Sequence, residues 1–182
     1  MIDGRVIIDS KKLQLMIERL CRQLIENYGN FEDTCLVGIQ PRGILLADRI
    51  YDQIQLLAPT AHLKYGKLDI TFHRDDFRSN EKPLKPYPTE MNFIVEKKKV
   101  ILVDDVLYTA RSVLAALSAL QHFGRASQIE LLVLIDRRFN RQLPIKANYV
   151  GLAVDAMDKD YVKVEWSQTH GQDRAMLFPE KR

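Results

Sequence analysis

Two adjacent carboxylates, Asp104 and Asp105, stand between a run of apolar residues and a short turn rich in hydroxyl groups. The apolar run at 100–103 is typical of a strand buried on both faces, and we expect the strand to end where the carboxylates begin. The turn at 108–112 leads into the apolar stripe of a helix, which Gly124 ends. Free N–H groups and the helix dipole at such a helix start favour a phosphate. The pattern therefore predicts a phosphate site beside an acidic pair.

A second strand, at 35–39, also leads through a tight turn into a helix start. The turn at 40–43 reads Q-P-R-G, and the helix after it has apolar residues at 44, 45, 47 and 50. This is a second candidate anion nest. Arg42 is its natural bidentate phosphate partner. Neither turn matches a P-loop or a G-x-G-x-x-G dinucleotide motif.

The remaining elements predict how these turns are held. Asp9 or Ser10 is expected to cap a first helix, and strands are expected at 62–73, 129–135 and, as an edge strand, 161–166. The first helix has one apolar face, made of Leu13, Met16, Ile17, Leu20 and Leu24. The alternation of strands and helices predicts an α/β fold with a mostly parallel sheet. The tail at 167–182 has no clear structural pattern.

Composition limits the class of protein. The 182 residues, 46% hydrophobic and 28% charged, predict one soluble domain over 1–182. The net charge of +3 permits phosphate-rich ligands or RNA without requiring either. Cys21 and Cys35 lack C-x-x-C spacing and are expected to be buried free thiols, and the four histidines form no zinc motif. No signal peptide or membrane span is apparent, so we expect a cytoplasmic protein.

The stretch 103–112, V-D-D-V-L-Y-T-A-R-S, resembles the phosphoribosyl-pyrophosphate (PRPP) motif of type I phosphoribosyltransferases. It is most similar to the pyrimidine operon regulator/uracil phosphoribosyltransferase (PyrR) family, whose version reads V-D-D-V-L-Y-T-G-R-T. Ser112 keeps the hydroxyl of the family's threonine. Ala110 replaces a glycine, adds a methyl group near the phosphate and disfavours positive φ. The resemblance implies that the acidic pair reads ribose hydroxyls and that the turn holds the 5′-phosphate.

Three further stretches carry the same resemblance. Residues 38–43 are similar to the family's pyrophosphate loop, G-I-K-T-R-G, in which a strained cis peptide is common, and we predict a cis peptide at Gln40–Pro41. Residues 69–77 resemble D-I-T-L-Y-R-D-D-L, which implies a lid loop over about 74–92. Residues 143–151 resemble L-P-I-R-A-D-Y-I-G and are expected over the base pocket. The resemblance spans roughly 5–151, leaving a divergent hood and tail at about 152–182.

The resemblance implies a type I phosphoribosyltransferase fold, with a central parallel sheet and a small hood from the chain ends. The implied catalytic residues are Asp104, Asp105, Arg74 and Arg42. The implied PRPP-binding residues are Asp104, Asp105, Tyr108, Thr109, Ala110, Arg111, Ser112, Gln40, Pro41, Arg42 and Gly43. The implied base-binding residues are Tyr108, Arg137, Tyr149 and Val150. Mg²⁺ is expected as the cofactor, held by PRPP with Asp104 and Asp105 in indirect contact, and family members form dimers or larger homo-oligomers.

Two questions stay open at this point. Tyr108 stands where purine salvage enzymes of this fold have an aspartate for the purine N7 proton, which favours uracil, whereas 150–155 loosely resembles the hypoxanthine enzymes and favours a 6-oxopurine. The family's second role is RNA-binding attenuation in response to pyrimidine nucleotides. The residues that could contact RNA phosphates are Arg19, Arg22, Arg141 and Lys146. The histidine that the family has before Arg141 is missing, and Glu18 adds a negative charge to that face.

Overall fold

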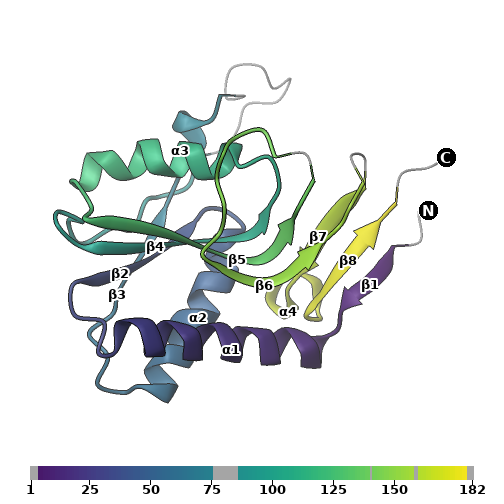
Figure 1. The fold of residues 1–182 in the computed structure, drawn as a ribbon, viewed down its shortest axis with the longest axis horizontal. Helices are drawn as coiled ribbons and strands as arrows, with labels where there is room; N and C mark the ends of the chain where they lie inside the picture. Colours follow the sequence, from purple (N-terminus) through teal and green to yellow (C-terminus); the bar gives the residue numbers. More distant parts are fainter. Residues whose placement is uncertain (1–3, 76–85, 140, 158–159, 180–182) are drawn as a thin grey trace.

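Five parallel strands form the centre of the computed structural model, which describes residues 4–75, 86–139, 141–157 and 160–179 (Figure 1). Their order across the sheet is β3-β2-β4-β5-β6. The strands are β2 (Thr34–Ile39), β3 (Lys64–Leu68), β4 (Lys99–Leu107), β5 (Gln128–Arg137) and β6 (Tyr149–Val154). The predicted α/β fold with a parallel sheet is confirmed.

Helices cover both faces of this sheet (Figure 1). Helices α1 (Ser10–Tyr28) and α2 (Gly43–Leu57) lie on one face, and α3 (Arg111–Leu120) lies on the other. Two 3₁₀ turns complete this part, η1 (Thr71–His73) and η2 (Gln121–Phe123). The Asp9 carboxylate accepts a 2.8 Å hydrogen bond from the Lys12 backbone N–H, which confirms Asp9 as the cap of α1.

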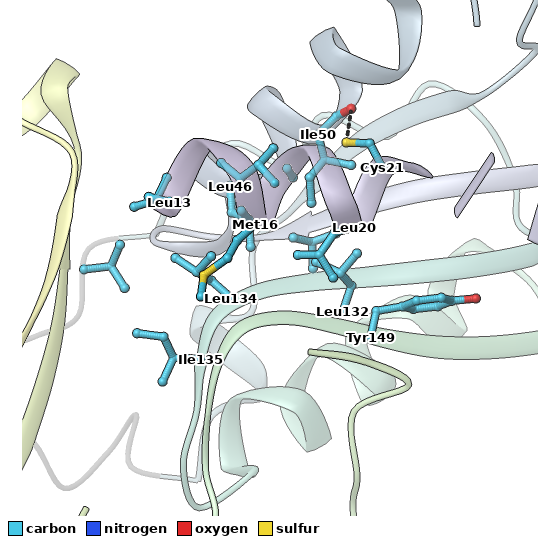
Figure 2. Close-up of a cluster of buried hydrophobic side chains, with 14 of the residues drawn as sticks. Leu13, Met16, Leu20, Cys21, Leu46, Ile50, Leu132, Leu134, Ile135 and Tyr149 are labelled. Atoms are coloured by element: carbon cyan, nitrogen blue, oxygen red, sulfur yellow. Dashed lines mark hydrogen bonds between the residues drawn. The ribbon is translucent and has the colours of Figure 1, made fainter. Parts of the chain in front are cut away.

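The core is divided between the two faces because side chains alternate along each strand. In β4, Ile101 and Val103 pack toward α1 and α2, whereas Val100 and Leu102 pack toward α3. Figure 2 shows the first of these cores, where leucines of α1 and α2 meet β5. The sheet is therefore buried on both faces, as the apolar runs predict, and its strand ends are held rigidly.

A smaller antiparallel sheet, the hood, is built from the two ends of the chain. Its order is β1-β8-β7, and its strands are β1 (Arg5–Ile8), β7 (Tyr161–Glu165) and β8 (Arg174–Phe178). A hood from the chain ends and the edge strand near 161 are thus confirmed, whereas β1 and β8 were not predicted. A short helix, α4 (Ser167–His170), precedes β8.

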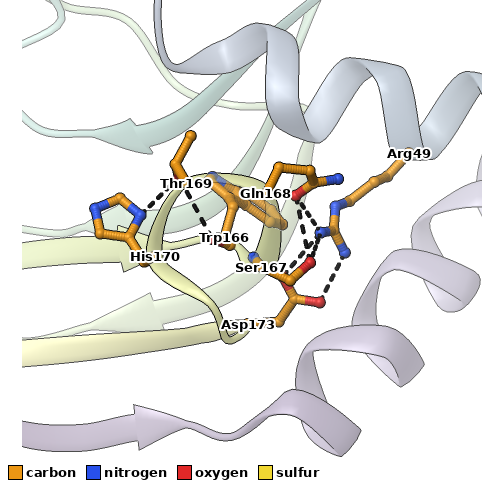
Figure 3. A network of polar contacts seen from close by, with 7 residues as sticks. All are labelled: Arg49, Trp166, Ser167, Gln168, Thr169, His170 and Asp173. Atoms are coloured by element: carbon orange, nitrogen blue, oxygen red, sulfur yellow. Dashed lines mark hydrogen bonds and ion pairs between the residues drawn. The ribbon is translucent and has the colours of Figure 1, made fainter.

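One arginine ties the hood to α2. The Arg49 guanidinium lies 4.7 Å from the centre of the Trp166 ring and forms a 2.8 Å ion pair with Asp173 (Figure 3). It also donates to Ser167 Oγ and Gln168 Oε1. The Arg49–Asp173 ion pair is partly buried, so these contacts fix the position of the hood relative to α2, which starts after the turn at 40–43.

Two predicted boundaries were wrong. The strand expected at 62–73 ends at Leu68, because the Asp69 carboxylate accepts bonds from the Thr71 N–H (3.3 Å) and hydroxyl (2.7 Å) and turns the chain into η1. Strand β4 continues to Leu107, so the acidic pair lies within the strand and not after it.

The predicted lid at 74–92 is described in part. Its residues 76–85 lie outside the described residues. After them, Glu90 pairs with Lys67 through two backbone hydrogen bonds, and the Asp69 N–H donates to Thr89 Oγ1. The end of this segment is therefore held against β3. Within the described part of the chain, no helix is long and apolar enough to cross a membrane.

Candidate active site

The two predicted turns meet at the carboxyl edge of the sheet. Gly38 of β2 pairs with Val103 of β4, so the turn at 40–43 lies directly beside the acidic pair. Ligands of open α/β sheets bind at this edge. A cleft of about 560 Å³ opens there, a volume that suits a nucleotide-sized ligand. Its lining includes Gln40, Pro41, Arg42, Arg74, Asp104, Asp105, Tyr108, Ser112 and Arg137.

Helix α2 starts unusually close to β4 at Gly43. A Cβ atom on Gly43 would lie 2.3 Å from the Val103 carbonyl oxygen and 3.0 Å from the Asp104 Cα. Only glycine permits this approach, which brings the turn of Arg42 against the acidic pair. The Gln40–Pro41 peptide is cis, as predicted. The Gln40 side chain is buried and donates a 2.7 Å hydrogen bond to the Pro88 carbonyl oxygen.

The acidic pair is buried. Asp104 and Asp105 are 8% and 6% exposed, and the Asp105 N–H donates a 2.9 Å bond to Asp104 Oδ1. Burial first and the Asp105 charge second raise the pKa of Asp104 well above its ordinary value. Burial also raises the pKa of Asp105, against the opposing effect of the Arg42 charge. The fold alone therefore disfavours the doubly ionised form of the pair, and hydrogen bonds from ligand hydroxyls or a nearby cation would stabilise that form.

The turn before α3 has the geometry of an anion nest, with one strained residue. Ala110 is the N-cap of α3 and adopts φ +72°, in the left-handed region that the family's glycine suits. No side chain caps the first turn of α3. Ser112 lines the cleft, and Thr109 Oγ1 accepts a 3.5 Å contact from the Arg111 N–H. The backbone N–H groups of this turn remain the main candidates for holding a phosphate.

The strain at Ala110 predicts an unusual response to glycine. Ala110→Gly removes about 1–2 kcal/mol of left-handed strain but loses a buried methyl worth about 0.8 kcal/mol, so stability should stay the same or rise slightly. Ala116→Gly, in the right-handed interior of α3, should instead cost about 2 kcal/mol. Urea unfolding followed by circular dichroism measures both variants. Equal losses in the two would contradict the strained geometry.

Arg137 and Tyr108 form the far wall of the cleft. The Arg137 guanidinium lies 3.8 Å from the centre of the Tyr108 ring and donates a 3.2 Å bond to the Met157 carbonyl oxygen. Arg137 is only 4% exposed, and its Nε has no hydrogen-bond partner among the described residues. Because the buried Arg137 Nε–H has no acceptor among the described residues, a ligand carbonyl oxygen that lies against this wall would be a favourable partner. Arg141 supports this wall by donating to the Tyr108 carbonyl oxygen and by pairing with Asp136.

Some residues of the predicted site lie elsewhere. Tyr149 belongs to the core on the α1 face, where its hydroxyl donates to Glu130 and accepts from Asn27. The Val150 carbonyl oxygen accepts a 2.9 Å bond from Arg19. The apolar residues at 143–147 pack against the core on the α3 face, so this segment does not cover the base pocket. Tyr149 and Val150 therefore leave the proposed base site.

Sequence reasoning missed part of the cleft lining. The missed residues are Ile39, Ile70, Thr71, Tyr87, Val106, Tyr161 and Val162. Tyr161 and Val162 begin the predicted edge strand, but nothing in the sequence shows that the hood brings this strand over the end of β4. Arg111 was expected to contact phosphate, yet it does not line the cleft and forms an ion pair of 2.6 Å with Asp75.

The residues considered for RNA contact do not share one environment. Arg19 donates to the carbonyl oxygens of Val150 and Gly151. Arg22 forms an exposed 2.7 Å ion pair with Glu18. Arg141 belongs to the wall of the cleft, and Lys146 is exposed in the segment before β6.

No group of three potential metal-ligating side chains occurs among the described residues. The acidic pair alone offers carboxylate oxygens, which Mg²⁺ prefers and which bind it in sites shared with ligand phosphates. The donor set thus fits a magnesium ion held mainly by a bound phosphate ligand.

Comparison with known proteins agrees with this geometry. Residues 7–168 match the family model described as "Phosphoribosyl transferase domain". The chain is 38% identical over 180 residues to the "Bifunctional protein PyrR" of Bacillus mycoides and of Bacillus cereus strain B4264, covering 98% of this chain and 99% of each relative. The similarity thus extends well beyond Gly151, and the limit predicted there was wrong.

Solved structures share the fold at low identity. A hypoxanthine phosphoribosyltransferase from Staphylococcus aureus superposes with a TM-score of 0.71 at 19% identity, covering 97% of this chain and 92% of that one. A hypoxanthine-guanine phosphoribosyltransferase from Bacillus anthracis gives 0.70 at 14% identity, covering 99% of both chains. The chain has the type I phosphoribosyltransferase fold, and it belongs to the phosphoribosyltransferase domain family and, within it, to the PyrR proteins.

Proposed function

We propose that this protein transfers the 5-phosphoribosyl group of PRPP to uracil, giving UMP and pyrophosphate. The observation that carries the proposal is the meeting, in one cleft, of two anion-binding turns, a buried acidic pair and a buried arginine. Each feature matches one part of the substrates. The reaction forms the bond between uracil N1 and the ribose C1 atom, breaks the bond from C1 to pyrophosphate, and releases the N1 proton.

The ribose phosphate end is held by the start of α3. Backbone N–H groups at 109–112 and the Ser112 hydroxyl bind the 5′-phosphate at the positive end of the helix dipole. Asp104 and Asp105 accept hydrogen bonds from the ribose hydroxyls, and such bonds to charged acceptors are strong in a dry site. This arrangement fixes the orientation of the ribose before the reaction, which is a main source of rate acceleration.

We assign the pyrophosphate to the part of the cleft that Arg42 and Arg74 line. Arg42 and Arg74 stabilise the charge that develops on the departing pyrophosphate. Bound Mg²⁺ supplies further neutralisation of the pyrophosphate oxygens. The acidic pair would contact that ion through the ligand, since Asp104 and Asp105 are the only carboxylates among the described residues that line the cleft.

The base is read at the Arg137 wall. Arg137 is placed to donate to a ring carbonyl, and uracil has two such carbonyls. A 6-oxopurine also has one, so Arg137 alone does not select the base. Tyr108 makes the selection, because it places an aromatic ring where a carboxylate would be needed for a purine N7 proton.

Replacing Arg137 should therefore weaken base binding selectively. Arg137→Gln is expected to raise KM for uracil about 10- to 100-fold, because a charged hydrogen bond in a buried site is lost. The dissociation constant for PRPP should be unchanged. Arg138→Gln is the matched control, since that neighbouring arginine is exposed and pairs with Asp155. Steady-state kinetics with calorimetric PRPP binding measure both. An equal change in both variants would contradict a base-reading role.

The test of the function is pyrophosphate release from PRPP and Mg²⁺ with uracil, hypoxanthine, guanine and xanthine offered separately. Release with uracil alone is expected. Release with a purine would support 6-oxopurine transfer and would mean that the hood outweighs Tyr108.

A nucleotide-sensing RNA regulator is the second candidate, because the relatives are named bifunctional. Release with no base, although PRPP or UMP still binds, would favour it. Of the residues considered for RNA, Arg22 and Lys146 are exposed. Arg19 and Arg141 instead form hydrogen bonds within the protein. A homodimer or larger homo-oligomer remains our prediction, as in the family.

A further inference from the structure

Arg74 lies between two anchored points of the chain. On its N-terminal side, Asp69 binds the Thr71 N–H and hydroxyl and fixes the 3₁₀ turn η1. On its C-terminal side, the next residue, Asp75, binds Arg111. Arg74 itself has extended backbone angles and lines the cleft. The backbone is therefore anchored on both sides of Arg74.

The second anchor is well formed. Arg111 Nε lies 3.0 Å and 2.8 Å from the two carboxylate oxygens of Asp75, and Arg111 Nη2 lies 2.6 Å from Oδ1. This is a bidentate arrangement, in which the planar guanidinium fixes the direction of the carboxylate. Arg111 is the first residue of α3, so the anchor ends on the rigid helix that also carries the phosphate turn.

The same contacts turn Arg111 away from the cleft. Arg111 does not belong to the cleft lining, although the next residue, Ser112, does. A direct role in phosphate binding would require Arg111 to leave Asp75. Backbone N–H groups at the start of α3 and the Ser112 hydroxyl offer donors for that phosphate without Arg111.

We propose that the Asp75–Arg111 ion pair holds Arg74 against the pyrophosphate end of the cleft, so that Arg111 is a positioning residue that acts through Asp75 and Arg74. The inference deepens the proposed function, because it rests on the assignment of that end of the cleft to pyrophosphate. Asp75 is 62% and Arg111 44% exposed, so the pair adds little to global stability. Its contribution is local geometry, and a small displacement of a catalytic group has a large kinetic effect.

Two ligands that each carry one end of PRPP test the proposal without turnover. Asp75→Asn is expected to weaken binding of Mg²⁺-pyrophosphate about tenfold in calorimetry, as one charged hydrogen bond is misplaced. Binding of ribose 5-phosphate and the melting temperature should not change. If Arg111 binds the 5′-phosphate instead, Asp75→Asn frees it, so ribose 5-phosphate binds more tightly and pyrophosphate binding is unaffected. That outcome would overturn the proposal.

A combination of variants checks the route through Arg74. In an Arg74→Ala background, Asp75→Asn should have no further effect on pyrophosphate binding, because the group being positioned is gone. A tenfold loss that persists in this background would refute the proposal. The exchanged pair, Asp75→Arg with Arg111→Asp, should recover binding that each single reversal loses. Asp33→Asn is the matched control, since Asp33 forms an exposed ion pair with Lys98 at the opposite end of the sheet.

These readouts separate the two proposals. Nucleotide formation by the wild-type protein tests phosphoribosyl transfer. The binding of pyrophosphate and of ribose 5-phosphate tests the positioning role, and this binding needs no reaction.

Discussion

Asp104→Asn should make the protein more stable and nearly inactive. The variant loses the charge that binds the ribose hydroxyls and faces the magnesium-bound substrate, and we expect kcat to fall about 10²- to 10³-fold. Its stability should rise because burial and the Asp105 charge disfavour ionised Asp104 in the folded protein. Asn keeps the oxygen that accepts the Asp105 N–H, so the local structure has no reason to change.

The pKa shift of Asp104 determines how the stability difference between wild type and Asp104→Asn changes with pH. The pKa of Asp104 is raised on folding, so the folded state binds the proton more tightly than the unfolded state. Wild-type stability is therefore lost as pH rises from the ordinary value of 3.8 toward the raised folded pKa, and the loss persists above it. Asp104→Asn has no carboxyl group to ionise at this position, so it should lose less stability than wild type between pH 5 and pH 8. Urea unfolding at both pH values measures the difference, with Asp33→Asn as control. A variant less stable than wild type at pH 8 would contradict the account.

Gly43→Ala should disrupt both the fold and the site. The new methyl group would lie 2.3 Å from the Val103 carbonyl oxygen, and backbone atoms cannot move away as a flexible side chain can. We expect a loss of about 1–3 kcal/mol in the free energy of unfolding. The start of α2 must also shift, which carries Arg42 away from the acidic pair. Displacement by about 1 Å is enough for a 10²-fold loss in kcat/KM.

Gly29→Ala separates these two effects. Gly29 ends α1 with φ +58°, and a Cβ there would meet nothing within 4 Å. This variant should lose about 1–3 kcal/mol from backbone strain, because L-residues rarely combine φ +58° with ψ −111°, while keeping full activity. Thermal unfolding and initial rates test the pair. Full activity in Gly43→Ala would show that the close contact of α2 and β4 does not set the position of Arg42.

The local motifs were predictable because each is a continuous stretch whose residue types favour one local structure. The strand that contains the apolar run at 100–103 is longer than predicted, but that strand, the turn before α3 and the turn at 40–43 follow the predicted order of strand, turn and helix. The cis peptide at Gln40–Pro41 was predicted from the resemblance of this turn to a loop class with a cis peptide, together with the lower cost of cis before a proline. The parallel sheet then brings both turns to one edge without further information.

The contacts between distant residues were not predictable in the same way. Asp75 and Arg111 are 36 residues apart, and only the packing of η1 on α3 brings them together. Tyr149 was expected at the base, but its side chain points to the α1 face, where a network with Glu130 satisfies its hydroxyl. The hood strands β1 and β8 are short, and their pairing depends on residues from opposite ends of the chain.

The most direct measurement is identification of the nucleotide product when uracil, hypoxanthine, guanine and xanthine are supplied together at equal concentration with PRPP and Mg²⁺. Mass spectrometry distinguishes the four possible products in one reaction. The account predicts UMP as the dominant product, formed about 10²- to 10³-fold more slowly by Asp104→Asn under the same conditions. A purine nucleotide as the main product would contradict the assignment of base choice to Tyr108.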